Sequence, residues 1–238
     1  MDVRIAQWIG ARSTQEDSYR VKFLPEGLLA VVCDGMGGHH HGAQASDAAA
    51  AAFLETFEDS SNTAPDARLR AALQAANAAV GKQGDSSGAY GGTTLLATYI
   101  CRGVLRWISV GDSPLFLWRR GYLIRLNEDH SLRPLLERFM TPERLNDSGE
   151  AHMLRSAVTG GEITMIDSPS MPYPLLPGDR ILLCTDGVDG VLCPRELSAE
   201  AIAALDDTSG NTAAILIELC KELRNPFADN TTVVAVNV

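Results

Sequence analysis

Hydrophobic positions recur along the chain in two ways: as short apolar runs or alternations typical of strands, and at the three-to-four-residue spacing typical of helices. The predicted strands are Val3–Ile9, Tyr19–Phe23, Leu28–Cys33, Thr93–Cys101, Val104–Val110, Pro114–Arg119, Tyr122–Leu126, Ile163–Ile166, Arg180–Cys184 and Thr231–Val238. The predicted helices are Gln44–Phe57, Asp66–Gln83, Pro194–Leu205 and Asn211–Leu223. Between them, 81–92 is a glycine-rich loop and 131–161 is less regular.

The order of these elements is strands, two helices, strands, two helices and a last strand. Strands that come in runs favour an α+β fold over an alternating βαβ chain. Two stacked sheets with a helix pair on each outer side would bury every apolar face. The sequence shows no internal repeat or linker, so we expect a single domain over residues 1–238.

Composition and charge exclude several classes of protein. The chain has 238 residues with 20 Lys and Arg against 30 Asp and Glu, which gives a net charge of −10. This balance argues against a nucleic-acid partner and against an anionic membrane surface. The five cysteines form no CxxC pair, and no apolar stretch reaches membrane-spanning length. These features predict a reduced, cytoplasmic protein.

Two apolar strands end in the same dipeptide, Asp-Gly. The run LLAVVC leads into Asp34, and RILLCT leads into Asp186. Asp-Gly is a favoured hairpin turn, but neither is followed by a returning strand with alternating polarity. A carboxylate at the end of a buried strand is costly unless it is paired or binds a metal. Two such ends indicate a shared site at one edge of the sheets.

Further carboxylates lie at predicted strand ends or turns: Glu16, Asp17, Asp112 and Asp229. Each alone is better explained as a turn or capping residue. Together they form an oxygen-rich set without the cysteine or histidine spacing of a zinc site. Hard cations such as Mg²⁺ and Mn²⁺ prefer these ligands.

Seven short motifs in order resemble those of the PPM family, the metal-dependent protein phosphatases of the 2C type, in their bacterial style. They are Arg12 with Gln15-Glu16-Asp17, Val32–His39, Gly91–Thr94, Val110–Ser113, Asp129–Ser131, Cys184–Gly187 and Asp229–Thr232. Each motif is weak by itself, whereas seven in order at compatible spacing are specific. They extend over nearly the whole chain.

The resemblance implies a four-layer αββα sandwich and an enzyme that hydrolyses phosphoserine and phosphothreonine at a binuclear Mg²⁺ or Mn²⁺ centre. It implies that Asp34 bridges two metals and that Gly35 offers its carbonyl to one. The other implied ligands are Asp186 and Asp229, with Glu16 and Asp17 partly through water, and Asp112 at a third ion. Arg12 matches the arginine that holds the substrate phosphate, for which a planar fork of donors is suited.

The same resemblance explains the reaction. A metal makes hydroxide available near neutral pH and stabilises charge on the phosphoryl oxygens. No covalent phosphoenzyme is needed, so Cys33 and Cys184 are interpreted as buried thiols rather than nucleophiles. The catalytic residues expected are therefore Arg12, Asp34 and Asp186.

The chain departs from the family pattern at a few positions. Pro114 stands where an arginine is usual and Gln15 where an asparagine is usual, and we expect the metal residues to tolerate both. Met36 stands where animal members carry a histidine, so the proton donor is not identified. Of the adjacent histidines, we expect His39 to be structural or to contact a metal ligand without binding the metal, and His40 and His41 to face solvent.

His130 is also interpreted as structural. Residues 131–157 match the family's flap and should shape substrate choice.

Two other functions were weighed. A pseudophosphatase that only binds phosphoproteins typically lacks one or more metal aspartates, and none is missing here. A two-metal nuclease is disfavoured by the acidic balance. The expected partners are phosphorylated proteins and a cognate serine/threonine kinase, and the expected state is a monomer.

Overall fold

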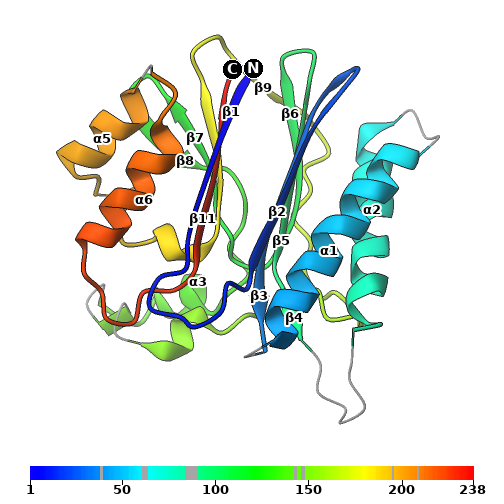
Figure 1. Ribbon diagram of the computed structural model, residues 1–238, viewed down its shortest axis with the longest axis horizontal. Coiled ribbons are helices and arrows are strands. Elements are labelled where there is room, and N and C mark those ends of the chain that lie inside the picture. Colours follow the sequence, from blue (N-terminus) through cyan, green and yellow to red (C-terminus); the bar gives the residue numbers. More distant parts are fainter. Residues whose placement is uncertain are drawn as a thin grey trace.

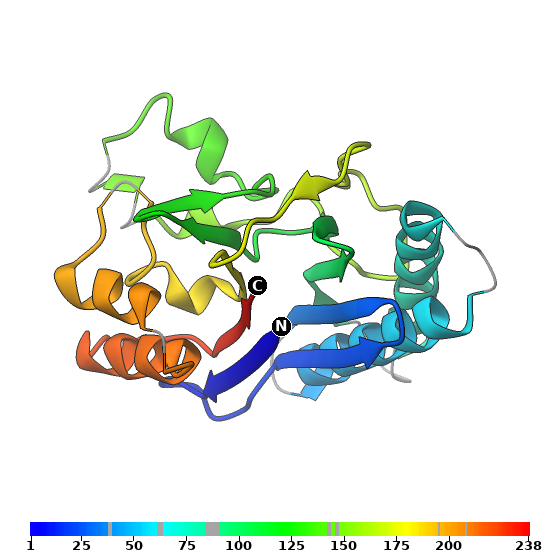
Figure 2. The same ribbon diagram turned by 90° about the horizontal axis from the view of Figure 1, so that it is seen from above.

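The computed structural model describes residues 1–37, 40–60, 64–83, 91–141, 144–145, 148–194, 196–207 and 209–238, with only the backbone described at His40. Four layers lie side by side: one helix pair, two sheets and a second helix pair (Figure 1). Seen from above, α1 and α2 cover one outer side and α5 and α6 the other (Figure 2). The predicted four-layer α+β sandwich is confirmed.

The strands are β1 (Asp2–Trp8), β2 (Asp17–Leu24), β3 (Gly27–Met36), β4 (Gly92–Thr93), β5 (Leu95–Cys101), β6 (Val104–Val110), β7 (Leu115–Arg119), β8 (Tyr122–Arg125), β9 (Tyr173–Pro174), β10 (Arg180–Cys184) and β11 (Thr231–Asn237). The helices are α1 (His40–Asp59), α2 (Pro65–Val80), α3 (Arg133–Leu136), α5 (Ala199–Asp206) and α6 (Thr212–Glu222), with 3₁₀ turns η1 (Gly149–His152) and η2 (Asp186–Val188).

Both sheets are antiparallel along their described ladders. The first has the order β1-β11-β10-β7-β8, and the second β2-β3-β5-β6-β9, with β4 paired to β3. Strand β11 lies between β1 and β10, so both ends of the chain meet in the first sheet (Figure 1). The register places Asp17 of β2 directly opposite Asp34 of β3.

The core has three apolar layers. Strand β3 contributes residues to two of them, one on each of its faces, and this explains its continuous apolar sequence. Leu29, Val31 and Cys33 face α1 and α2. Leu28 and Val32, on the opposite face, join the layer between the two sheets. A strand buried on both faces needs apolar residues at every position rather than at alternate ones. The third layer packs α5 and α6 against the first sheet.

The prediction of a strand over Ile163–Ile166 is wrong, because no strand is assigned there. Side chains hold this backbone in place of a ladder. The Ser156 hydroxyl donates to the Met165 carbonyl and accepts from the Met165 N–H, and the Thr164 hydroxyl donates to the Arg155 carbonyl. The apolar residues there pack below α2 without pairing.

Helix boundaries were predicted less well than helix positions. Helix α5 begins at Ala199 rather than at residue 194, because the Ser198 hydroxyl accepts from the N–H of Ala201 and caps the helix there. Helix α2 begins at Pro65, whose missing N–H costs nothing in a first turn. Most of the glycine-rich loop, 84–90, lies outside the described residues.

Candidate metal centre

Five aspartates from both sheets gather at one end of the sandwich. Asp17 begins β2, Asp34 lies near the end of β3, Asp186 follows β10, Asp112 follows β6 and Asp229 precedes β11. Burial raises the pKa of Asp34 well above its ordinary value, and the other four carboxylates raise it further by repulsion. The fold therefore brings together the aspartates that the sequence predicted.

Asp17 is buried between the two sheets. Its Oδ2 accepts hydrogen bonds from the hydroxyls of Thr185 (2.9 Å) and Thr232 (2.6 Å), whereas its Oδ1 has no hydrogen-bond partner. Burial raises the pKa of Asp17 from 3.8 to about 7, although both hydroxyls oppose the shift. A buried carboxylate with one unsatisfied oxygen is suited to a cation.

The backbone around Asp34 is held from two sides. Its carbonyl accepts from the N–H of Thr94 and the hydroxyl of Thr93, both at 2.9 Å, and its N–H donates to the Thr94 hydroxyl at 2.9 Å. Gly35 follows because a Cβ there would lie 2.3 Å from the carbonyl oxygen of Gly42. The Asp-Gly pair thus ends a strand where α1 begins, as the sequence indicated.

Glu16 is positioned through Asn230. The N–H of Glu16 donates to Asn230 Oδ1 at 2.6 Å, while Asn230 Nδ2 donates to the carbonyls of Ile9 (2.8 Å) and Thr14 (3.1 Å). Asn230 is buried, so this amide ties the loop after β1 to the start of β11. Asn230 belongs to one of the seven sequence motifs, but its role in holding Glu16 was not predicted; its position beside Asp229 was the available signal.

We expect Asn230→Ala to lower the free energy of unfolding by about 2–4 kcal/mol, since it leaves three partly buried backbone groups without their partner in Asn230. Urea unfolding followed by circular dichroism measures this. Asn211→Ala is the matched control, because the exposed Asn211 side chain makes no capping hydrogen bond. Equal effects of the two substitutions would contradict the role of Asn230.

Asp186 opens the 3₁₀ turn η2. Burial and repulsion, first from Asp112 and Asp189, raise its pKa well above the ordinary value, and its Oδ1 has no hydrogen-bond partner. Its Oδ2 lies 4.0 Å from Nδ1 of His152. Residue 152 belongs to η1, so this 3₁₀ turn brings an imidazole to the carboxylate. Neither Asp189 nor His152 was predicted: Asp189 ends the same turn as Asp186, so its nearness in the sequence was the available signal, whereas only the fold brings His152 there.

Asp229 and Arg12 form an ion pair, with Arg12 Nη2 2.6 Å from Asp229 Oδ2. The N–H of Asn230 donates to the other oxygen, Asp229 Oδ1, at 2.7 Å. The predicted phosphate-binding arginine therefore lies directly beside a predicted metal ligand. Both side chains are substantially exposed, so the guanidinium is free to turn toward a substrate.

Asp112 lies in a turn held by two residues of the β8 region. Arg125 donates to the Asp112 carbonyl at 2.6 Å and to Asp129 at 3.2 Å. The buried His130 accepts from the N–H of Gly111 through Nδ1 at 3.2 Å, which agrees with its predicted structural role. Burial, with repulsion from Asp129 and Asp189, raises the pKa of Asp112 to about 7. Arg125 was not predicted.

The three histidines after β3 were not expected to bind the metals directly. His39 lies outside the described residues, and of His40 only the backbone is described. His41 is half-buried in α1, so the expectation that it faces solvent holds only in part. Met36, in the place of a family histidine, pairs with Gly92 at the end of β3.

The carboxylates at this end of the sandwich are of the type that binds divalent cations, although their side chains do not converge on one point as metal ligands do. Within the described part of the chain, no group of three or more Asp, Glu, His or Cys side chains is arranged to hold a metal ion. Asp17 and Asp229 instead direct oxygens to Thr232 and Arg12. A cation would give the unpaired oxygens of Asp17 and Asp186 a partner. It would also offset the repulsion between Asp34 and the neighbouring carboxylates. To bind a cation, Asp17 Oδ2 and Asp229 Oδ2 would have to turn away from their present partners.

Comparison with known proteins decides the family. The family model described as protein phosphatase 2C matches residues 8–224. The chain belongs to this family. The serine/threonine protein phosphatase PstP of Mycobacterium tuberculosis is similar, with 33% identity over 95% of this chain and 43% of that protein. The chain thus spans less than half the length of this relative.

Other relatives match this chain over most of their own length. The serine/threonine phosphatase stp of Listeria monocytogenes is 28% identical over 87% of this chain and 83% of that protein. A solved structure of the catalytic domain of PstP in complex with two manganese ions is 31% identical, with a TM-score of 0.79 over 98% of this chain and 96% of that one. The fold predicted from the motifs is therefore that of the family.

Proposed function

We propose that this 2C-type chain is a protein serine/threonine phosphatase that uses two Mn²⁺ or Mg²⁺ ions, with Asp112 at the place of a third. The observation that carries the proposal is the convergence of five aspartates beside Arg12 at one end of the sandwich. Family membership, relatives named as serine/threonine phosphatases and the manganese complex of a PstP catalytic domain support it.

The ions, when bound, would supply an activated water and neutralise charge on the phosphoryl group. Asp34 would bridge them, with the Gly35 carbonyl on one and Asp186 and Asp229 on the other. Glu16 and Asp17 would support the set, Asp17 through the oxygen that its threonine partners leave unpaired.

Arg12 would hold two oxygens of the substrate phosphate with its planar fork and so orient the phosphorus toward the metals. Cys33 and Cys184 take no part. Both thiols are fully buried, and burial raises the pKa of each well above the ordinary value, so neither is a thiolate nucleophile.

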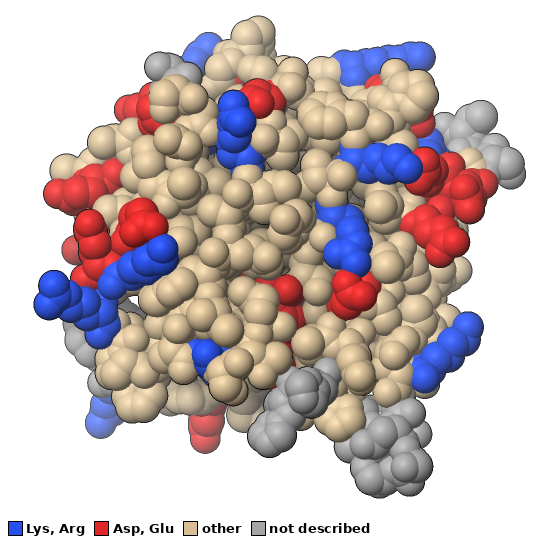
Figure 3. Space-filling view, in the orientation of Figure 1, with Lys and Arg blue, Asp and Glu red and all other residues tan. Residues whose placement is uncertain are grey.

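The alternatives are weaker on the same observations. The aspartates that a pseudophosphatase would lack are all present and close together. On the face shown in Figure 3, the basic and acidic side chains of the described residues are scattered, without a continuous basic patch for a nucleic-acid backbone. A nuclease would need such a patch.

Phosphate release from a phosphothreonine peptide in Mn²⁺ tests the proposal. We expect turnover with Mn²⁺, none after EDTA, and no cleavage of DNA under the same conditions. Metal-dependent binding of the phosphopeptide without phosphate release would favour the pseudophosphatase, and DNA cleavage would favour the nuclease.

Finer assignments belong to the same proposal. We infer a monomeric single domain over 1–238 that acts on phosphorylated proteins and opposes a serine/threonine kinase, with 131–157 as a flap that selects substrates. All five cysteines are free thiols, which suits a reducing cytoplasm. In the described residues, no helix has both the length and the apolar character needed to cross a membrane.

Arg12→Ala should have two opposite effects. Loss of the guanidinium should lower kcat/KM for a phosphopeptide about 10- to 100-fold, because a charge-assisted contact to phosphate is lost. Mn²⁺ should bind more tightly, because Arg12 no longer competes for Asp229. Steady-state kinetics and calorimetric Mn²⁺ titration measure these effects.

The control for Arg12 is Lys221→Ala, which removes an exposed cation from α6. It should change neither quantity. If Arg12→Ala weakens Mn²⁺ binding, the guanidinium supports the metal site rather than competing with it, and this part of the proposal is wrong.

A further inference from the structure

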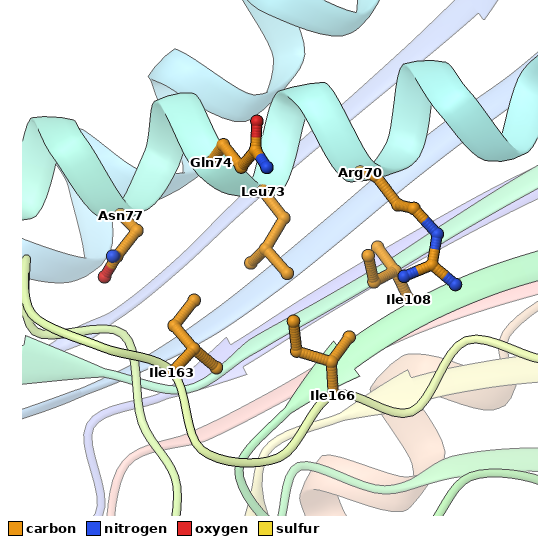
Figure 4. Close-up of a pocket in the computed structure, with 7 residues that line it drawn as sticks. All are labelled: Arg70, Leu73, Gln74, Asn77, Ile108, Ile163 and Ile166. Atoms are coloured by element: carbon orange, nitrogen blue, oxygen red, sulfur yellow. The ribbon is translucent and has the colours of Figure 1, made fainter.

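A groove with a volume of about 290 Å³ lies between α2 and the segment 159–167, which leads from the flap toward β9. None of the metal-centre aspartates lines it. Leu73 projects from α2 toward Ile163 and Ile166 on the facing segment, and the Arg70 guanidinium and Asn77 lie toward opposite ends (Figure 4). Between these polar ends the groove is lined by four aliphatic side chains together with Gln74 of α2.

The apolar surface of the groove is partly exposed. Leu73 and Ile108 of β6 are buried and form its floor, and Ile163 is half-buried against the core beneath α1 and α2. Ile166, however, keeps 43% of its surface exposed. An aliphatic group in the groove would cover this side chain without disturbing the core below.

Arg70 is an exposed arginine of α2 at one end of the groove. It makes no hydrogen bond or ion pair among the described residues, although the protein carries a net charge of −10. Its neighbour on the same side of α2, Asp66, is instead paired with Arg106 at 3.3 Å. Figure 4 shows the Arg70 guanidinium beside Ile108, where it would meet the head of a molecule lying in the groove. An unpaired fork of donors at this place fits a carboxylate.

The far wall of the groove is fixed before any ligand binds. Asn77 Oδ1 accepts from the N–H groups of Thr159 (3.2 Å) and Gly160 (2.9 Å), and its Nδ2 donates to the Gly161 carbonyl at 2.7 Å. Gly160 has φ +86°, and a Cβ there would lie 2.2 Å from the Cα of Gly81, so only glycine allows this approach. A preformed wall reduces the entropy lost on binding.

We propose that this groove binds a small aliphatic carboxylate, with the carboxylate on Arg70 and the hydrocarbon chain against Leu73, Ile108, Ile163 and Ile166. The volume suits a short chain and is too small for a helix of a partner protein. The site is separate from the phosphatase centre, so the proposal does not depend on the proposed function.

The test uses octanoate as the probe and the Mg²⁺-loaded full chain with labelled isoleucine methyl groups. Octanoate should shift the methyl resonances of Ile108, Ile163 and Ile166 in a saturable manner. Octylammonium, with the same chain and the opposite charge, should not. Arg70→Gln should weaken octanoate binding about tenfold or more, as expected for loss of a hydrogen-bonded charge.

Lys82→Gln is the matched control, because it removes an exposed positive charge just beyond the end of α2 while leaving the groove intact. It should bind octanoate like the unmodified chain. Equal binding of octanoate by Arg70→Gln, equal binding of octylammonium, or shifts confined to other methyl groups would each overturn the proposal. The methyl spectrum of Arg70→Gln without ligand shows directly that the variant is folded.

Discussion

Asp34→Asn is expected to lower the Mn²⁺-dependent phosphatase rate about a thousandfold or more, and at the same time to raise the melting temperature of the metal-free protein. The rate falls because the amide cannot bridge two cations, and charge stabilisation at the phosphoryl group is lost. Stability rises because the substitution removes a buried charge that four neighbouring aspartates repel. If Asp34 had only a structural role, its substitution would lower both the phosphatase rate and the melting temperature.

Kinetics in saturating Mn²⁺ and thermal unfolding after EDTA treatment measure the two effects of Asp34→Asn. Asp59→Asn, at the exposed end of α1, is the control and should change the stability by no more than about 0.5 kcal/mol. Full activity of Asp34→Asn in saturating metal would refute the bridging role. A lower melting temperature in EDTA would instead show that the Asp34 carboxylate stabilises the fold by itself.

The metal-free protein should become less stable as the pH rises from about 4 to about 7, which is unusual for an acidic protein. The pKa of Asp17 is raised from 3.8 to about 7 by burial, and that of Asp112 also to about 7. Between these values the folded state binds more protons than the unfolded state, so stability decreases with pH. For Asp17 alone the loss is on the order of 4 kcal/mol.

Mn²⁺ should reverse this pH dependence. Metal ions bind ionised carboxylates and stabilise only the folded state, so the stabilisation by Mn²⁺ grows as the pH rises. Urea unfolding between about pH 5 and 8, with EDTA or with Mn²⁺, measures both slopes. Asp17→Asn should flatten the EDTA curve. If the free energy of unfolding in EDTA increases through this range instead, the pKa of Asp17 is not raised by burial as described.

Much of this site could be predicted from the sequence because it follows directly on strand ends. Asp34 and Asp186 end apolar strands, and the antiparallel sheets bring such ends together, so their convergence needed only the element order. The continuous apolar run before Asp34 also reported burial on both faces of β3 correctly.

What could not be predicted depends on contacts between segments far apart in the chain. Arg12 meets Asp229, and Asn230 holds Glu16, across more than 200 residues. His152 of η1 approaches Asp186 to 4.0 Å although 34 positions separate them in the sequence. The false strand at Ile163–Ile166 has the same cause, since its apolar residues are explained by packing beneath α2 rather than by a ladder.

The position of β11 between β1 and β10 has a consequence for synthesis. Strand β1 has its only described ladder with β11, so it stays unpaired until residues 231–237 have been made. Asp229 and Asn230 arrive with the same segment. A chain emerging from the ribosome can form the second sheet and the α1–α2 pair first, whereas the first sheet closes last. The growing polypeptide should therefore gain its ability to bind Mn²⁺ only after residues 229–237 have left the ribosome.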